Sequence, residues 1–151
     1  MEATQVKTRA ETLSCIYENV KMGADSIVNL LPKVQDSRLK SDMSVQMSGY
    51  EKFAARAREE LRSMGVEAQE KGMMTKAMAK IGMEMNTMTD TSLSHIAEMM
   101  IQGSNMGIIE MNKCINACQR SGCEDSAGAV KMAKEILDFE QENLERMKYY
   151  L

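Results

Sequence analysis

A chain of 151 residues is long enough to bury the core of one domain. Its 19 basic and 22 acidic side chains give a formal net charge of -3 and form no basic stripe or block, so nucleic acid is not an expected partner. No apolar run approaches the roughly 20 residues that span a bilayer, and the first residues lack the pattern of a signal peptide. We therefore expect a cytoplasmic protein with no membrane span.

The composition favours helices over strands. The chain has 17 methionines, one proline and only 4% aromatic residues. Alanine, leucine, methionine, glutamate and lysine, which are good helix formers, are abundant. The β-branched and aromatic residues never cluster with the alternation that a strand requires. An all-α fold is the expectation.

Two helices are expected in the first part of the chain, at 4–31 and 37–64. In both, apolar residues recur in steps of three and four, as in the seam of a helical bundle. The single proline ends the first helix, Asp36 or Ser37 caps the second, and Gly65 follows its end. Because the connection is only a few residues long, the two helices should form an antiparallel hairpin.

The second part of the chain predicts a short helix at 73–88 and two longer ones at 90–121 and 125–150. A run of Thr, Asp and Ser between the first two is good capping chemistry, although one long kinked helix over 73–121 is the alternative. Gly122 ends the third core helix. The short turn that follows predicts a second antiparallel hairpin.

Two long hairpins joined by a longer connection are the plan of ferritin-like bundles. The segments 103–107 (GSNMG), 136–143 (ILDFEQEN) and 148–150 (KYY) extend this likeness. In these features the chain resembles small bacterial ferritin-like families, in which small residues lie in the third core helix and an acidic, tyrosine-ended fourth helix closes the bundle. The resemblance implies one antiparallel four-helix-bundle domain over residues 1–151.

A ferritin-like di-iron site requires carboxylates from four helices and two Glu-x-x-His pairs. The single histidine, His95, is preceded three residues earlier by Ser92 instead of a glutamate. Only Glu110 and Glu140 fall on the apolar seams. We therefore expect no complete di-iron site and no cofactor. The alternative is an iron site built from Glu110, Glu140 and His95.

A buried polar layer is a second possible role for the two glutamates. If the first hairpin is centred near residues 33–34, Tyr17 and Tyr50 stand level with each other, roughly as Glu110 and Glu140 do. The tyrosine hydroxyls could then satisfy the carboxylates, which need a partner when buried. The other interpretation places both glutamates at the seam edge with exposed heads.

Two glycines also lie on the seam of helix 90–121. Gly103 and Gly107 each cost about 1 kcal/mol of helix propensity relative to alanine. A helix that accepts this cost is expected to gain a close contact with another core helix, or room for large neighbours such as Tyr17 and Tyr50.

Three cysteines lie close together in the chain. Cys114 and Cys118 share one helix face and Cys123 lies just past the helix end, so they could bind a soft ion such as copper or zinc, or act in redox sensing. Cysteine is also a common buried small residue, which is the simpler interpretation. In a cytoplasmic protein we expect all four cysteines to be reduced.

The methionines concentrate in helix 73–88, where they recur at helical spacing. Methionine is adaptable, and a Met-rich amphipathic helix suits a partner surface. We expect this helix to dock on a second copy, giving a dimer, or on another protein. The function that follows is a non-enzymatic bundle that acts by self-association or protein–protein interaction. A metal-binding or thiol-redox bundle is the alternative.

Overall fold

The computed structural model describes residues 2–68, 76–122 and 127–151. Helices make up nearly all of these residues, and no strand occurs among them. Across the same residues, no helix combines the length and apolar character needed to cross a membrane. The elements in chain order are α1 (Glu2–Leu30), a 3-10 turn (Leu31–Lys33), α2 (Ser37–Ser63), α3 (Lys76–Thr87), α4 (Leu93–Arg120) and α5 (Ala127–Lys148).

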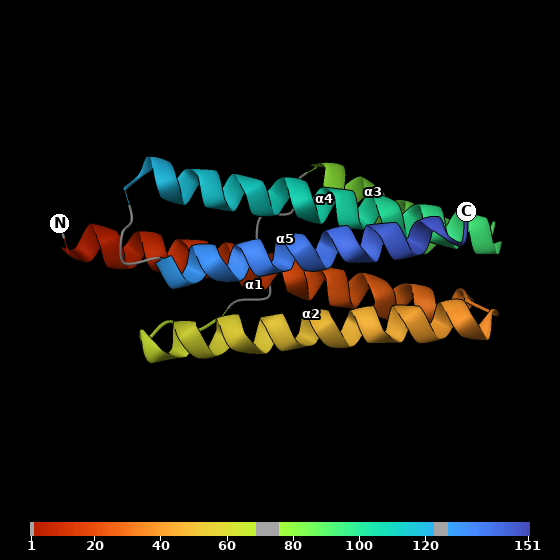
Figure 1. Cartoon of the computed structure of the whole chain (residues 1–151), viewed down its shortest axis with the longest axis horizontal. Coiled ribbons are helices and arrows are strands. Elements are labelled where there is room, and N and C mark those ends of the chain that lie inside the picture. Colours follow the sequence, from red (N-terminus) through yellow and green to blue (C-terminus); the bar gives the residue numbers. More distant parts are fainter. Residues whose placement is uncertain (1, 69–75, 123–126) are drawn as a thin grey trace.

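The four long helices form two antiparallel hairpins, α1–α2 and α4–α5 (Figure 1). The hairpins join mainly through α1 and α4, which run in opposite directions. The short helix α3 packs on both α1 and α4. The predicted all-α, antiparallel four-helix bundle with an extra helix in the connection is confirmed.

The helix ends follow from the predicted capping chemistry. The Asp36 carboxylate accepts a hydrogen bond of 2.8 Å from the third residue of α2, and the Ser92 hydroxyl accepts one of 3.4 Å at the start of α4. Gly65 and Gly122 adopt φ angles of +74° and +68° just past the ends of α2 and α4, where a left-handed residue stops a helix. Because residues 88–92 are not helical, the described part of the stretch 73–121 forms two helices, α3 and α4, and not one long kinked helix.

One face of α3 is used within its own chain. Met85 is buried against the bundle, and its Cε lies 3.9 Å from where a Cβ on Gly103 would stand. Lys33 donates to the carbonyl oxygen of Met85 over 2.6 Å, which places a positive charge at the C-terminal end of α3. On the other side of the helix, Met83 is 67% exposed. Of the methionines of α3 whose side chains are described, only Met83 is free for a partner.

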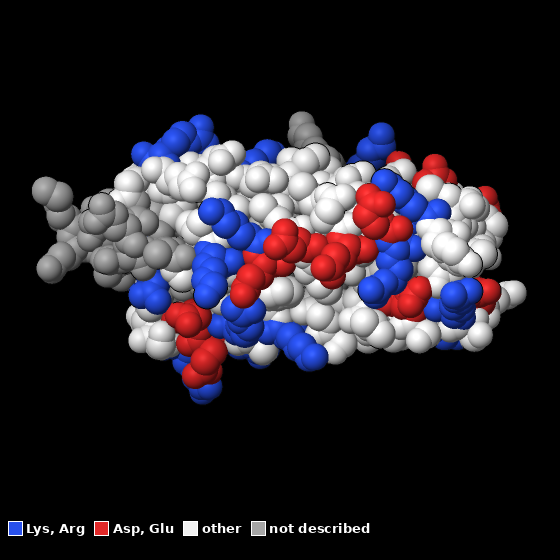
Figure 2. Space-filling model, viewed as in Figure 1, with Lys and Arg blue, Asp and Glu red and all other residues white. Residues whose placement is uncertain are grey.

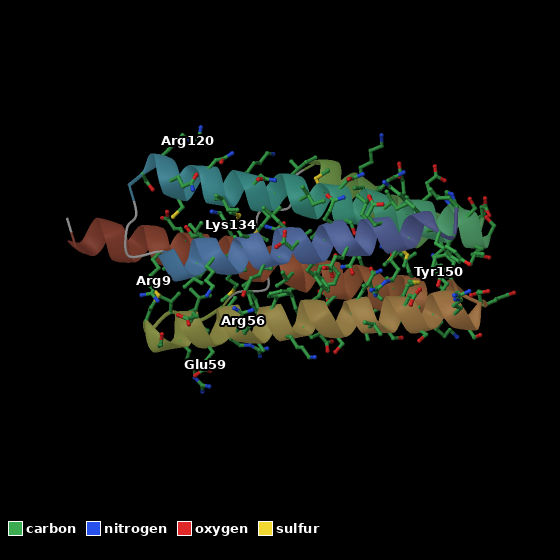
Figure 3. The ribbon with its side chains drawn as sticks, viewed as in Figure 1. Arg9, Arg56, Glu59, Arg120, Lys134 and Tyr150 are labelled. Atoms are coloured by element: carbon green, nitrogen blue, oxygen red, sulfur yellow. A yellow bond between two sulfur atoms is a disulfide. The ribbon has the colours of Figure 1, made fainter. Side chains whose placement is uncertain are left out.

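Large side chains bridge α2 and α5, whose backbones approach each other less closely than those of the hairpin partners. Near the middle, the rings of Tyr50 and Phe139 meet edge to face with centroids 5.0 Å apart. Toward the start of α5, Arg56 projects from α2 and pairs with Glu135 at 2.7 Å (Figure 3). Buried polar residues lie along this contact between α2 and α5.

Candidate functional site

A cluster of polar side chains is buried at the middle of the bundle. Tyr50 of α2 donates a hydrogen bond of 2.7 Å from its hydroxyl to the carboxylate of Glu140 in α5. Ser104 of α4 interacts with both groups, and Asn143, one turn after Glu140, interacts with Tyr50. All four residues are at most 5% exposed. Three helices therefore contribute to one enclosed polar layer.

Two glycines make room for this layer. A Cβ on Gly107 of α4 would stand 2.7 Å from the nearer carboxylate oxygen of Glu140. A Cβ on Gly23 of α1 would stand 2.7 Å from the ring of Tyr50. Real Cβ atoms do not approach other atoms so closely, so a side chain at either position would force Glu140 or Tyr50 to shift. The prediction that Gly107 accommodates a large neighbour was right in kind, but the neighbour is Glu140.

Among the described residues, no positively charged side chain joins the layer to balance an ionised Glu140. Burial raises the pKa of Glu140 to about 7, although the hydrogen bonds from Tyr50 and Ser104 partly oppose this rise. Burial and the neighbouring carboxylate also raise the pKa of Tyr50 well above its ordinary value. Glu140 thus takes up a proton at a higher pH than an exposed glutamate does, and Tyr50 keeps its proton and remains the donor.

Gln46 adds a second polar residue of α2 to the interior, one turn before Tyr50. It is 1% exposed, and neither atom of its amide has a hydrogen-bond partner within the described part of the chain. Leaving such a group buried and unpaired costs roughly 1–3 kcal/mol. Gln46 was not among the residues predicted for the site, although a glutamine three residues after Met43 and four before Tyr50 lies on the apolar seam.

The predicted four-residue layer of Tyr17, Tyr50, Glu110 and Glu140 is only half correct. Tyr17 is buried, but the ring of Tyr50 lies against Gly23, six residues further along α1. Six residues correspond to roughly 9 Å along a helix, so the two tyrosines are not level.

Glu110 does not join the buried cluster either. Its side chain is 13% exposed and pairs with Lys113 at 3.2 Å. It lines a surface groove between α1 and α4, which is the seam-edge position of the other interpretation but without the exposed head expected there. The inward positions of α4 are taken instead by Ser104 and Met111, both 2% exposed or less.

The predicted iron ligands Glu110, Glu140 and His95 do not converge. His95 lies in the first turn of α4, with its Nδ1 atom 3.4 Å from the carboxylate of Glu98. It precedes Glu110 by 15 residues in the same helix, which is roughly 22 Å along the axis. No single ion could contact both side chains.

The donors around Glu140 do not fit a di-iron centre. Two irons in a helical bundle need several carboxylates and histidines that point to one place. The layer offers one carboxylate, two hydroxyls and an amide, and its carboxylate already accepts from Tyr50. Within the ranges that the structure covers, no three His, Cys, Asp or Glu side chains are grouped so as to hold a metal.

The cysteines are arranged differently from the expected thiol site of Cys114, Cys118 and Cys123. Cys114 forms a disulfide with Cys15 of α1, and Cys118 is not a free thiol either. The expectation of reduced thiols therefore differs from the structure for these three residues. Cys123 lies outside the described residues. Sequence spacing could not have found Cys15, because it comes near Cys114 only through the packing of α1 against α4.

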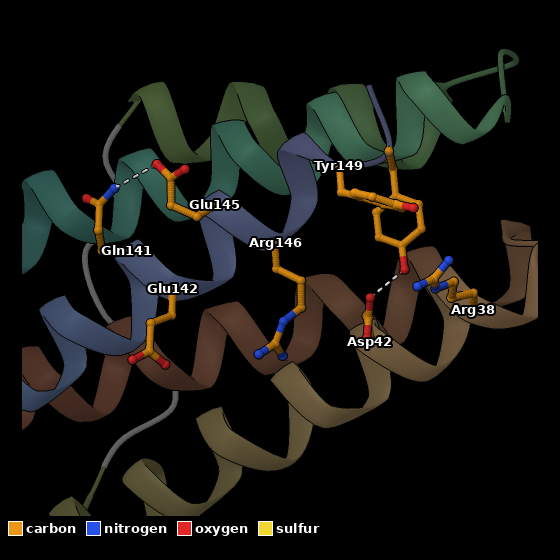
Figure 4. A pocket seen from close by; sticks show the side chains of 8 residues that line it. Arg38, Asp42, Gln141, Glu142, Glu145, Arg146 and Tyr149 are labelled. Carbon is orange, nitrogen blue, oxygen red and sulfur yellow. Dashed lines mark hydrogen bonds between the residues drawn. The ribbon is translucent and has the colours of Figure 1, made fainter.

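A surface groove of about 670 Å³ lies between α2 and the last turns of α5 (Figure 4). Tyr150 is buried at one end and donates from its hydroxyl to the carboxylate of Asp42. Beside it, the guanidinium of Arg38 lies over the ring of Tyr149, 5.2 Å from the centroid. Tyr149 itself is 73% exposed. An exposed tyrosine stacked on an arginine is a common element of protein interfaces.

The face that carries this groove has charges of both signs. In Figure 2, acidic side chains form a run over α5, with basic side chains on either side of it. The surface is therefore suited to pairing with a mixed-charge partner more than with a uniformly charged polymer.

Among solved structures, this chain is similar to a ferritin-like, diiron-carboxylate protein from Bacillus anthracis str. Ames. The TM-score is 0.70, the match covers 96% of each chain, and the sequences are 14% identical. The sequence matches no protein-family model, and it matches no curated protein. At this identity the similarity concerns the fold alone. The chain thus has the ferritin-like four-helix-bundle fold that its helix pattern predicted.

Proposed function

We propose that this protein is a non-catalytic ferritin-like bundle that acts by self-association, through the groove between α2 and α5. The non-catalytic part of this proposal is supported by the surroundings of Glu140. It is the one carboxylate of the buried layer, and it already accepts a hydrogen bond from Tyr50. The structural neighbour is described as a diiron-carboxylate protein, but this chain's interior donors differ from such a ligand set.

Metal content tests this part of the proposal. The protein is expressed with added iron, purified without chelator and measured by elemental analysis, and the apo form is then titrated anaerobically with Fe(II). We expect well under one metal ion per chain and no saturable binding. Stoichiometric metal that is lost in Glu140→Gln but kept in Glu110→Gln would contradict the proposal. Copper and zinc are measured in the same samples.

Self-association is supported by unpaired charges in the groove. Glu142 and Arg146 both line it, and neither has an ion-pair partner among the residues described. They lie one turn apart on α5. In a two-fold dimer formed through this groove, Arg146 of each copy can face Glu142 of the other, because such an interface uses the same patch twice. Tyr149 and Arg38 would add the large contact residues.

A charge exchange tests the dimer. Sedimentation velocity should show a monomer–dimer equilibrium with a Kd of roughly 100 µM or lower. This Kd corresponds to a binding free energy of about -5.5 kcal/mol or stronger. Arg146→Glu and Glu142→Arg should each give monomers, and an equimolar mixture of the two variants should restore dimers. Lys52→Glu, on the exposed face of α2 outside the groove, is the matched control. A wild-type chain that stays monomeric, or a mixture that does not recover, contradicts self-association through this surface.

The earlier expectation that helix 73–88 makes the contact is tested alongside. Met83, the exposed methionine of α3, is replaced by glutamate. If the dimer forms through the α2–α5 groove, Met83→Glu should leave it intact. Loss of the dimer in this variant alone would assign the contact to α3.

A further inference from the structure

A disulfide links the two hairpins of the bundle. Cys15 in α1 bonds to Cys114 in α4, 99 residues later in the chain, with the two Cα atoms 6.4 Å apart. This separation lies within the usual range for a disulfide. Since α1 belongs to one hairpin and α4 to the other, the bond crosses the interface through which the hairpins mainly pack.

The bond lies on the wall of a surface groove, away from the centre of the core. The groove has a volume of about 330 Å³, and both cysteines line it. Cys15 is half-buried, whereas Cys114 is only 6% exposed. Of the two residues, Cys15 is therefore the more accessible to a small thiol that enters the groove. A disulfide with only a structural role has no need of such an approach.

Polar groups beside the bond suit the chemistry of a thiolate. The side-chain amide of Asn19 lies 3.7 Å from Cys15 Sγ and can donate to it, while it also donates to the Cys15 carbonyl oxygen over 2.8 Å. The groove wall also carries Glu11 and the ion pair of Lys113 with Glu110. The hydrogen-bond donor beside Cys15 favours a thiolate, which is the species that attacks and leaves in disulfide exchange.

We propose that the Cys15–Cys114 disulfide is an exchange site for low-molecular-weight thiols. An incoming thiolate attacks Cys15 Sγ, forms a mixed disulfide there and breaks the bond to Cys114, whose sulfur leaves with the electron pair and takes a proton from water. A second thiolate then attacks the small-thiol sulfur of the mixed disulfide, and Cys15 leaves as a thiolate beside Asn19. Two small thiols are oxidised to their disulfide while the protein disulfide is reduced to two thiols.

The exchange changes how the two hairpins of the bundle are held together. In the oxidised form the hairpins are tied together covalently through α1 and α4. In the reduced form they are held by packing and by non-covalent contacts such as those of Tyr50 with Glu140 and of Arg56 with Glu135. The thiols of the surroundings thereby set how firmly the two hairpins are joined. This inference is independent of the dimer proposed above, since the two grooves share no residue.

The test uses the full chain, purified without reductant. It is equilibrated with set ratios of reduced and oxidised glutathione and quenched with acid, and each cysteine is then assigned by differential alkylation and mass spectrometry. We expect a reversible two-electron transition at Cys15 and Cys114, with the mixed disulfide trapped on Cys15 at least about tenfold more than on Cys114. A bond that stays intact in the folded protein under excess reduced glutathione overturns the proposal, as does an adduct found chiefly on Cys114.

Two variants that each lack one cysteine of the pair compare how readily Cys15 and Cys114 react. In Cys114→Ser the remaining Cys15 should react with oxidised glutathione several times faster than Cys114 does in Cys15→Ser. Adding Asn19→Ala to Cys114→Ser should slow the reaction of Cys15 most at low pH, where the amide donor contributes most to the thiolate population. Equal rates in the two single variants, with both folded by circular dichroism, overturn the proposal that the groove exposes Cys15.

Discussion

Glu110 and Glu140 have the same place in the sequence pattern but very different surroundings. Glu140 is enclosed between α2, α4 and α5 and accepts from Tyr50, whereas Glu110 lies at the wall of a surface groove and pairs with Lys113. Gly107, against which Glu140 packs, is only three residues before Glu110 in α4. What differs is the space available. At Gly107 the missing side chain lets a carboxylate from α5 enter the interior.

The two regions should therefore respond to different conditions. The buried layer holds a carboxyl group without a neighbouring cation, so its energy depends on the protonation of that group. The groove holds an ion pair near water and a disulfide, so it should respond to thiols and only weakly to the loss of one charge. The following changes test this contrast.

The largest expected effect is the pH dependence that Glu140 contributes. Its pKa is about 7 in the folded protein, above the ordinary value of 4.5, so the stabilising protonated form is lost as the pH rises through 7. Between pH 5 and pH 8 this group should lower the unfolding free energy by about 2–3 kcal/mol. Glu140→Gln, which keeps an acceptor for Tyr50, should lack this pH-dependent loss of unfolding free energy. Urea unfolding at several pH values, with Glu110→Gln as the control, measures the difference.

Because other groups also titrate, the contribution of Glu140 is the difference in unfolding free energy between wild type and Glu140→Gln at each pH. Wild type and Glu140→Gln should be closest in stability near pH 5, and the variant should become the more stable one by pH 8. Parallel curves for wild type, Glu140→Gln and Glu110→Gln would show that the buried carboxyl does not titrate in this range.

Alanine at two neighbouring seam glycines should have opposite effects. A Cβ at Gly107 would come within 2.7 Å of Glu140, whereas at Gly103 it would meet only Met85 at 3.9 Å, an ordinary contact. Gly103→Ala should stabilise the protein by about 0.5–1 kcal/mol through helix propensity. Gly107→Ala should destabilise it by about 1–3 kcal/mol through crowding. Thermal unfolding of both variants decides this, and a stabilising Gly107→Ala would mean that Glu140 moves away at little cost.

The sequence predicted the fold well because the relevant signals are local. The spacing of apolar residues, the single proline, and caps such as Asp36 and Ser92 each act within a few residues. The candidate site was predicted less well because its members meet across helices. Which residue of α1 meets the ring of Tyr50, Gly23 instead of Tyr17, depends on how α1 packs against α2. The contact between Cys15 and Cys114 depends in the same way on how the hairpins dock.

A smaller effect is expected at Gln46, whose buried amide has no partner in the described part of the chain. Gln46→Met keeps a similar shape and removes the unpaired polar atoms, so it should stabilise the protein by about 1 kcal/mol. Val45→Met, at the exposed neighbouring position, is the control and should change little. Chemical unfolding at a single pH suffices. Destabilisation by Gln46→Met would indicate that the amide is satisfied by something the protein binds, such as an enclosed water.

The smallest effect belongs to the groove glutamate. Glu110 pairs with a lysine that is 66% exposed, and solvent and salt screen such a pair. Glu110→Gln should change the unfolding free energy by less than about 0.5 kcal/mol at physiological salt. A loss as large as that of a buried group would mean that Glu110 belongs to the interior after all, and the contrast with Glu140 would fail. Repeating the measurement at high salt separates the two cases, because only a screened surface pair weakens further as salt is added.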